Sequence, residues 1–343
     1  MTRIAIINGD RIKQARELNG LTQSELAKLV GCNQSAIAHF ENNRTAPSEE
    51  VLIKIADATN VLPEFFEKLS VSGFSLGTLS YRSRNSLTKK EESKAYQYAI
   101  TMYEQIKMLS SRLRLPTLRF PRLSEKPSLS ARVTRVSLGL EPDKPISNLI
   151  NAFENNGGIV LITPFSLPNI DAFSHWGDLD IERPIIFISS GIPGDRLRFS
   201  VAHEMGHLVM HTAPMGKISS MEKEANVFAA ELLMPGETIR NELTLPMTLT
   251  SIAQLKPKWG VSMQALIYRA HELKIITDRQ YRYLFEQLSA KGWRTKEPSN
   301  LDIPIEAPQA FVKMVQSVYR NTELYADDIK FKPSLARELI AYN

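Results

Sequence analysis

The fold is decided by the stretch Phe199-Ser200-Val201-Ala202-His203-Glu204-Met205-Gly206-His207-Leu208-Val209-Met210-His211. It contains two histidines four residues apart, with a glutamate beside the first. Because four residues make just over one helical turn, His203 and His207 would project from the same face of a helix. Two imidazoles placed in this way can share one Zn²⁺ ion, and Glu204 would be positioned to accept a proton from a water molecule. The alternative is an amphipathic helix with two ordinary histidines.

The composition is that of an ordinary globular protein, with 43% hydrophobic and 23% charged residues among 343. The only cysteine, Cys32, excludes a disulfide framework and a cysteine-rich zinc site, and it favours a reducing cytoplasm. The apolar run at the N-terminus is too short for a signal peptide. No run approaches the ~20 apolar residues that cross a bilayer, so we expect a cytoplasmic protein without a membrane partner.

Residues 8–69 carry the pattern of five short helices. Thr22 and Glu25 form a capping-box pair before the second helix, and Asn33 is placed to cap the third. The run from Leu21 to Pro47 resembles the helix-turn-helix domain of the Cro/cI, or XRE-type, repressor family. That resemblance implies a recognition helix in the major groove of DNA.

The same resemblance implies which side chains contact DNA. It places Gln34, Ser35 and His39 against bases. It places Gln23, Asn43 and Arg44 against phosphates. The alternative is a small helical domain that docks to protein, because residues 1–70 hold eight basic and nine acidic residues.

The segment 71–127 is basic, with eleven Lys or Arg residues against four Glu. Thr88 and Glu91 form a second capping-box pair, and apolar residues at helical spacing predict a helix from there to Leu113. Two interpretations remain open. The segment is either a solvated connector or a supplementary basic surface that helps the neutral first domain to bind DNA.

The stretch around the two histidines belongs to a longer pattern. Buried strands are predicted at 159–162 and 184–188, with an extended stretch beginning at Asp171. The runs 157–160, 183–187 and 198–207 resemble the ImmA/IrrE metallopeptidase family. The family's second signature is also present, at 222–235. The resemblance covers about residues 145 to 240 and strengthens the assignment of zinc as a cofactor.

A catalytic zinc ion needs three protein ligands and one open position. Glu222 and Glu224 are the candidates for the third ligand. Glu222 shares the helix face of the apolar Ala225, whereas Glu224 is rotated away, so we favour Glu222. Asn226 lies on the same face as Glu222 and could hydrogen-bond a ligating imidazole. His211 shares the helix face of His207. The longer zincin pattern, however, places its third histidine ligand three residues further along the chain.

The region 241–343 is predicted to be mostly helical. Residues 250–273 resemble a helix-turn-helix-like element that follows the peptidase core in this family. Arg269 and Arg279 could contact nucleic acid there. We favour a packing role for Trp259, Leu266 and Tyr268.

The sequence therefore predicts a multidomain, mainly α protein. An all-α helix-turn-helix domain spans 1–70, and a basic helical linker spans 71–127. An α+β zincin-like peptidase domain with a small sheet spans 128–240, and a helical region with a helix-turn-helix-like element spans 241–343.

The predicted function is that of a DNA-binding zinc endopeptidase. By resemblance, such proteins cleave a repressor or an antitoxin in stress responses or in the control of mobile elements. The expected partners are an operator-like duplex and that protein substrate, and a homodimer on a palindrome is compatible with this arrangement. One alternative is a transcription regulator whose peptidase-like domain senses or docks a partner without cleaving it. Another is an antitoxin-like protein that binds a toxin through its second half.

Overall fold

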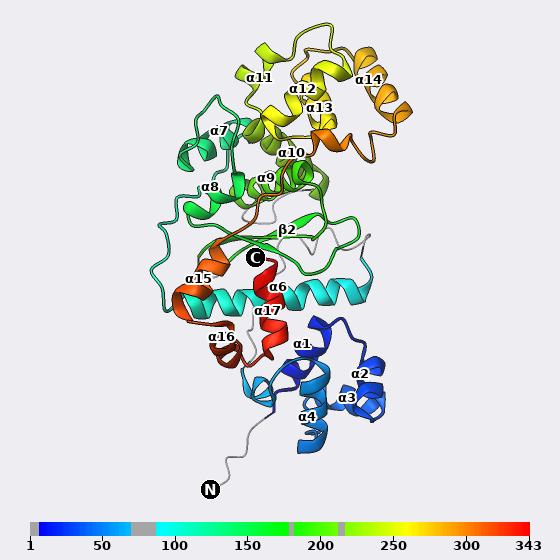
Figure 1. Ribbon diagram of the computed structural model, residues 1–343, viewed down its shortest axis with the longest axis vertical. Helices are drawn as coiled ribbons and strands as arrows, with labels where there is room; N and C mark the ends of the chain where they lie inside the picture. Colours follow the sequence, from blue (N-terminus) through cyan, green and yellow to red (C-terminus); the bar gives the residue numbers. More distant parts are fainter. Residues whose placement is uncertain (1–6, 70–86, 178–181, 212–216) are drawn as a thin grey trace.

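The computed structural model of the chain describes residues 7–69, 87–177, 182–211 and 217–343 (Figure 1). Helices dominate these residues, and one three-stranded sheet lies near the middle of the molecule. The prediction of a mainly α, multidomain protein with a small sheet is therefore confirmed. No helix in these ranges combines the length and the apolar character needed to cross a lipid bilayer.

The N-terminal domain contains four α-helices followed by one short 3-10 helix. They are α1 (Gly9–Leu18), α2 (Gln23–Val30), α3 (Gln34–Glu41), α4 (Glu49–Ala58) and η1 (Pro63–Glu67). The side chains of Thr22 and Glu25 form a capping box at the start of α2, and Asn33 caps α3. The five predicted short helices are confirmed, the last of them as a 3-10 helix.

The sheet has the strand order β1-β3-β2. Its strands are β1 (Ile159–Ile162), β2 (Ala172–Trp176) and β3 (Pro184–Ile188). The central strand β3 pairs in parallel with β1 and antiparallel with β2. Ile185 and Phe187 enter one hydrophobic cluster, whereas Ile186 and Ile188 enter another on the opposite face. Because both faces are covered, β3 is apolar throughout, which is the signal that made it predictable.

Helices of the peptidase-like part cover one face of the sheet, and a further group lies beyond them at one end of the molecule (Figure 1). The first group is α7 (Pro127–Ser137), α8 (Leu149–Asn155), α9 (Gly194–Met210) and α10 (Ile218–Leu233). The second group is α11 (Gly236–Glu242), α12 (Leu249–Trp259), α13 (Met263–Glu272) and α14 (Asp278–Ala290). Helix α9 contacts β2 and β3 on one side and α10 on another.

The second group contains the helix-turn-helix-like element, and its predicted packing is only partly correct. Trp259 and Leu266 are fully buried, as expected. Tyr268 is 53% exposed, but its ring lies 5.8 Å from that of Tyr281 and 5.1 Å from that of Phe285 in α14, so its packing is partial.

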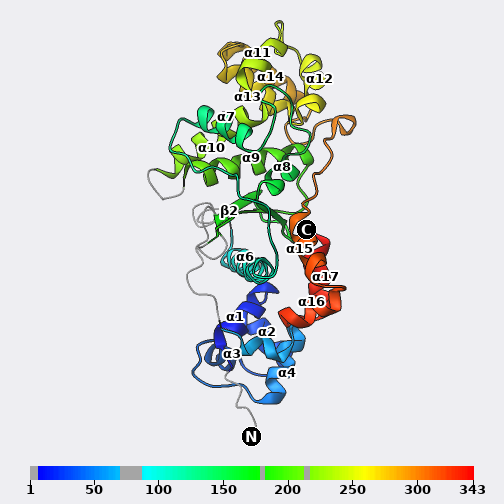
Figure 2. The ribbon, with the colours of Figure 1, turned by 90° about the vertical axis from the view of Figure 1, so that its left-hand side faces the viewer.

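The long helix α6 (Lys89–Ser110) covers the other face of the sheet and separates it from the N-terminal domain (Figures 1 and 2). Its predicted capping box, Thr88 with Glu91, is present. A polar stripe on α6 faces α1: the amide of Gln97 donates to Glu17 Oε2 at 3.0 Å. The opposite stripe is apolar and carries Tyr98, whose ring centroid lies 6.3 Å from that of Phe187 in β3.

Helix α6 is therefore not a solvated connector, because eleven of its residues are buried. Some of the positive charges of this segment are also paired with carboxylates at the protein surface. Lys90 lies 3.2 Å from Glu25 in α2, and Arg112, just after the helix, lies 2.6 Å from Asp328. Residues 71–86 of the basic segment lie outside the described ranges.

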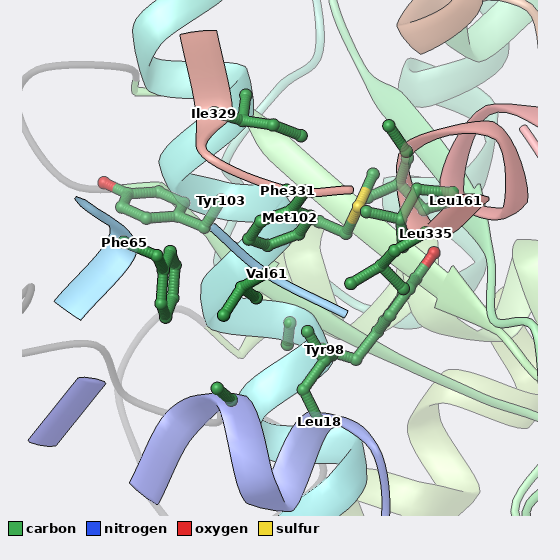
Figure 3. Packing of buried hydrophobic residues seen from close by; sticks show 14 of the residues in the cluster. Leu18, Val61, Phe65, Tyr98, Met102, Tyr103, Leu161, Ile329, Phe331 and Leu335 are labelled. Atoms are coloured by element: carbon green, nitrogen blue, oxygen red, sulfur yellow. The ribbon is translucent and has the colours of Figure 1, made fainter. Parts of the chain in front are cut away.

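The last part of the chain returns past the sheet to the N-terminal domain. It contains η3 (Ser299–Leu301), α15 (Ala310–Val318), α16 (Thr322–Ile329) and α17 (Pro333–Ala341). Phe331 forms an antiparallel bridge with Val61, and its ring lies 5.4 Å from that of Phe65 (Figure 3). Tyr98, Met102 and these residues belong to one hydrophobic cluster. The N-terminal domain, α6, the sheet and the end of the chain therefore share a core.

Candidate metal centre

The pairing of α9 with α10 creates the candidate site. Gly206 lies where the two helices meet, and a Cβ atom there would stand only 3.0 Å from the ring of Phe228. Glycine thus permits a close approach that a larger residue would hinder. This approach brings Glu222, in the first turns of α10, to the face of α9 that carries His203 and His207.

Three side chains converge at this point. The Nε2 atoms of His203 and His207 are 3.1 Å apart. Glu222 places one carboxylate oxygen 3.3 Å from His203 Nε2 and the other 3.2 Å from His207 Nε2. The edges of a tetrahedron around a zinc ion with bonds of about 2.0–2.1 Å are about 3.3–3.4 Å long. The spacing of the three side chains therefore fits three corners of a zinc coordination sphere, with the fourth left open.

The other ring nitrogens fix the orientation of both imidazoles. His203 Nδ1 lies 2.9 Å from the side-chain oxygen of Asn226, and His207 Nδ1 lies 3.0 Å from His211 Nδ1. His211 Nε2 in turn lies 3.0 Å from a carboxylate oxygen of Glu224. Since the oxygens of Asn226 and Glu224 can only accept, His203 carries its proton on Nδ1 and His211 carries its proton on Nε2.

The pKa shifts agree with this assignment. Burial lowers the pKa of His211, which favours its neutral form, and the hydrogen bond from His211 lowers the pKa of Glu224. A neutral His211 with its proton on Nε2 accepts at Nδ1, so His207 donates from Nδ1. Both Nε2 atoms then present lone pairs to each other and to Glu222. Three electron-rich atoms this close repel one another unless a cation lies between them, so the site fits a metal ion.

Glu204, beside the first histidine, is fully buried. Its Oε2 atom accepts a hydrogen bond of 2.7 Å from the hydroxyl of Ser174 in the edge strand β2. The strand is held against α9 by Trp176, whose ring N–H donates to the carbonyl of Leu208 at 2.8 Å. Sequence reasoning missed Ser174. The available signal was a hydroxyl side chain at the alternate position between the apolar Ala172 and Trp176, which share one face of the strand.

Two further histidines lie away from the three converging atoms. His175 follows Ser174 in β2 and therefore points to the opposite face of the sheet, where its ring centroid lies 5.9 Å from that of Tyr103 in α6. His271 lies 2.7 Å from Asp278 near the end of α13. Neither residue adds a ligand to the site.

A second candidate site is the exposed face of α3 in the N-terminal domain. Gln34 Nε2 donates to Gln23 Oε1 at 2.6 Å, and Gln23 Nε2 donates to Glu41 Oε2 at 2.8 Å. Glu41 is buried and forms an ion pair with Arg16 of α1. The two glutamines are thus held in a fixed orientation by a chain of hydrogen bonds that ends in the core.

The other residues expected to contact DNA surround this pair. Ser35, His39 and Arg44 are exposed. Asn43 is exposed too, but its side-chain oxygen accepts a hydrogen bond of 2.7 Å from the backbone N–H of Gly9. This face and the metal centre lie at opposite sides of α6 (Figure 1).

Arg269 of the second helix-turn-helix-like element has a structural position. Its side chain is only 1% exposed and forms ion pairs with Glu231 and Glu272. A nucleic-acid contact by Arg269 is therefore excluded, because the guanidinium group is enclosed between α10 and α13.

Comparisons with known proteins match two parts of the chain. A model of the IrrE N-terminal-like domain matches residues 155–271, and a helix-turn-helix model matches residues 12–66. Antitoxin HipB of Escherichia coli (strain K12) is 39% identical over 67 residues, which cover 17% of this chain and 76% of that protein. Antitoxin HipB of Escherichia coli O6:H1 is also 39% identical over 67 residues and is covered to 71%.

The geometry separates the roles of the two glutamates of α10. We expect Glu222→Ala to weaken zinc binding by at least about a hundredfold, because it removes one of three converging donors. Glu224→Ala should weaken it by less than about tenfold, since Glu224 acts only through His211. Competition titration with a chromophoric chelator measures both constants. A larger loss in Glu224→Ala than in Glu222→Ala would contradict the assignment.

Proposed function

Because the chain belongs to the ImmA/IrrE family and carries an XRE-type helix-turn-helix domain, we propose that it is a DNA-binding regulatory zinc endopeptidase. Its substrate is a repressor or an antitoxin-type protein. The observation that carries the proposal is the convergence of His203, His207 and Glu222, with Glu204 on the same helical turn.

The three converging side chains would hold a zinc ion through His203 Nε2, His207 Nε2 and the carboxylate of Glu222. When bound, the ion would supply a Lewis acid that acidifies water and polarises a peptide carbonyl. Asn226 and His211 orient the two imidazoles through their Nδ1 atoms. Burial of both histidines limits the access of bulk water, which strengthens electrostatic interactions at the site.

Glu204 is the general base in this proposal. It accepts the proton of the attacking water on its carboxylate and delivers it to the leaving amine. The hydroxyl of Ser174 donates to Oε2 and thereby fixes the orientation of the carboxylate. A purely structural metal site does not need a buried carboxylate beside its ligands, so Glu204 favours a catalytic role over a structural one.

The N-terminal domain supports the proposed class of substrate. It resembles antitoxin HipB over most of that protein's length, and its α3 face holds two glutamines in fixed orientation. Glutamine can form two hydrogen bonds with an adenine base. A peptidase that reads DNA with such a domain meets its substrate where repressors and antitoxins bind. It works in the compartment that holds DNA, which we take to be the cytoplasm.

The main alternative is a transcription regulator whose peptidase-like domain docks a partner without cleaving it. This protein would use the same DNA-binding face and the same metal centre. It differs in one respect, because it would have no use for a proton acceptor at Glu204.

The decisive experiment compares the native host carrying the wild type with the host carrying Glu204→Gln. Terminal proteomics should detect a cleaved repressor or antitoxin in the wild type. We expect the rate of its formation to fall by about 10²–10⁴-fold in the variant, the usual contribution of a general base. Zinc content and DNA binding should be unchanged.

The control is Glu237→Gln, an exposed carboxylate on α11 that is distant in sequence from the site. Equal cleavage by wild type and Glu204→Gln would refute the mechanism. The absence of any cleaved protein in both strains would favour the docking alternative.

DNA recognition is tested separately. We expect the double variant Gln34→Ala with Arg44→Ala to bind its operator at least about tenfold more weakly, because one base contact and one phosphate contact are lost. The operator is first obtained by selection from genomic fragments. Lys54→Ala serves as a control, since Lys54 lies on α4 and pairs with Glu50. An unchanged gel shift of the double variant would refute the assignment of α3 to the major groove.

A further inference from the structure

A large cavity lies between the peptidase-like helices and the group α12–α14. Its volume is about 1430 Å³. The start of α9 and the outer face of α10 form one wall, and α13 forms the facing wall. Residues 293–297 and 302–305, which flank η3, line it further. In Figure 1 this is the region where α10 lies beneath α13.

The cavity lies behind His203, on the side away from the converging Nε2 atoms. Asn226 lines the cavity, and its side-chain oxygen contacts His203 Nδ1. Phe199, one helical turn before His203, lines the cavity as well. A ligand in the cavity would therefore be separated from the three converging side chains by Asn226 and the ring of His203.

The buried cations of the cavity are neutralised by the protein. Lys256 is almost fully buried and forms ion pairs with Asp195 and Glu297. Arg269 forms its ion pairs with Glu231 and Glu272, as described above. Because these two charges are already compensated, they are not available to a phosphate or a nucleic acid. The other cations of the lining, Arg196, Arg294 and Lys296, are exposed.

Aromatic and aliphatic side chains contribute much of the remaining lining. Tyr268 of α13 is 53% exposed, and its ring centroid lies 5.1 Å from that of Phe285. Ile305 lines the cavity and is 62% exposed, and Trp293 also lines the cavity. Exposed aromatic side chains of this kind are typical of surfaces that bind polypeptides.

The position of Tyr268 also indicates the direction in which the outer face of α13 points. In a DNA-binding helix-turn-helix the second helix exposes its outer face to the major groove. Here Gln264, Tyr268 and His271 share a face at helical spacing, and all three line the cavity. The outer face of α13 is therefore directed at the metal-binding half of the protein.

We propose that this cavity binds a segment of the polypeptide substrate and holds a large apolar or aromatic side chain against Tyr268 and Trp293. The inference rests on the proposed peptidase function and specifies its substrate class. The volume supports a segment of several residues, because it exceeds the roughly 300–1,000 Å³ of pockets for small ligands.

Binding is measured on the full chain carrying Glu204→Gln, so that no turnover occurs. The probes are fluorescein-labelled peptide pools with a central Phe, Leu, Ser or Asp and randomised flanks. By fluorescence anisotropy, the Phe and Leu pools should bind about tenfold more tightly than the Ser and Asp pools. Tyr268→Ala, which removes the aromatic surface, and Ala265→Trp, which fills the cavity, should each abolish this preference.

The matched control is Tyr283→Ala, because Tyr283 is 58% exposed on α14 and does not line the cavity. It should retain the preference. Tyr268→Ala removes side-chain volume from the cavity and Ala265→Trp adds it, so the two variants test the cavity independently. Circular dichroism checks that both variants are folded. Equal binding of all pools, or a preference that survives both cavity variants, would overturn the inference.

Two other outcomes have distinct meanings. A labelled duplex whose binding is lost in Tyr268→Ala but kept in Gln34→Ala would assign the cavity to nucleic acid and overturn the inference. If the wild type cleaves no protein while the Phe and Leu preference is observed, the proposed function fails and the binding assignment stands. If cleavage occurs without the preference, only the inference fails.

Discussion

Two imidazole nitrogens and one carboxylate point at a common centre with their lone pairs, and the rest of the peptidase-like half depends on this convergence. Its geometry requires α9 and α10 to pack closely, which Gly206 allows against Phe228. It also requires each imidazole to hold its proton on the far nitrogen. A metal cation between these three side chains would offset the cost of bringing their electron-rich atoms together.

The same helix α9 rests on a sheet whose other face is part of a second core. That core extends through α6 into the N-terminal domain and includes the last helices of the chain (Figures 1 and 3). Phe331 bridges to Val61, so the DNA-binding domain is attached by the end of the chain as well as by α6. The N-terminal domain is therefore packed against the rest of the protein and not merely joined to it by a linker.

Local patterns account for what the sequence could predict. The four-residue spacing of His203 and His207, the capping pairs and the apolar run of β3 each depend on neighbours in the chain. The choice of Glu222 over Glu224 as the residue that meets the histidines followed from the helix face alone, and the structure brings Glu222 to them. These features need no knowledge of distant contacts.

What escaped prediction depends on contacts between distant segments. The hydroxyl of Ser174 meets Glu204 only because β2 lies at the sheet edge beside α9. The burial of α6 requires the end of the chain to return across it, which its basic composition conceals. Tyr268 is exposed because α13 faces a cavity. In the sequence, the helical spacing of Tyr268 is the same as that of a residue packed in a core.

The most direct test of the central claim is X-ray absorption spectroscopy at the zinc edge on the purified full chain. We predict a four-coordinate ion with two imidazole nitrogens and one carboxylate oxygen at about 2.0–2.1 Å, and a fourth light ligand. A protein that retains no zinc after loading, or a coordination shell that lacks imidazole, would contradict the account.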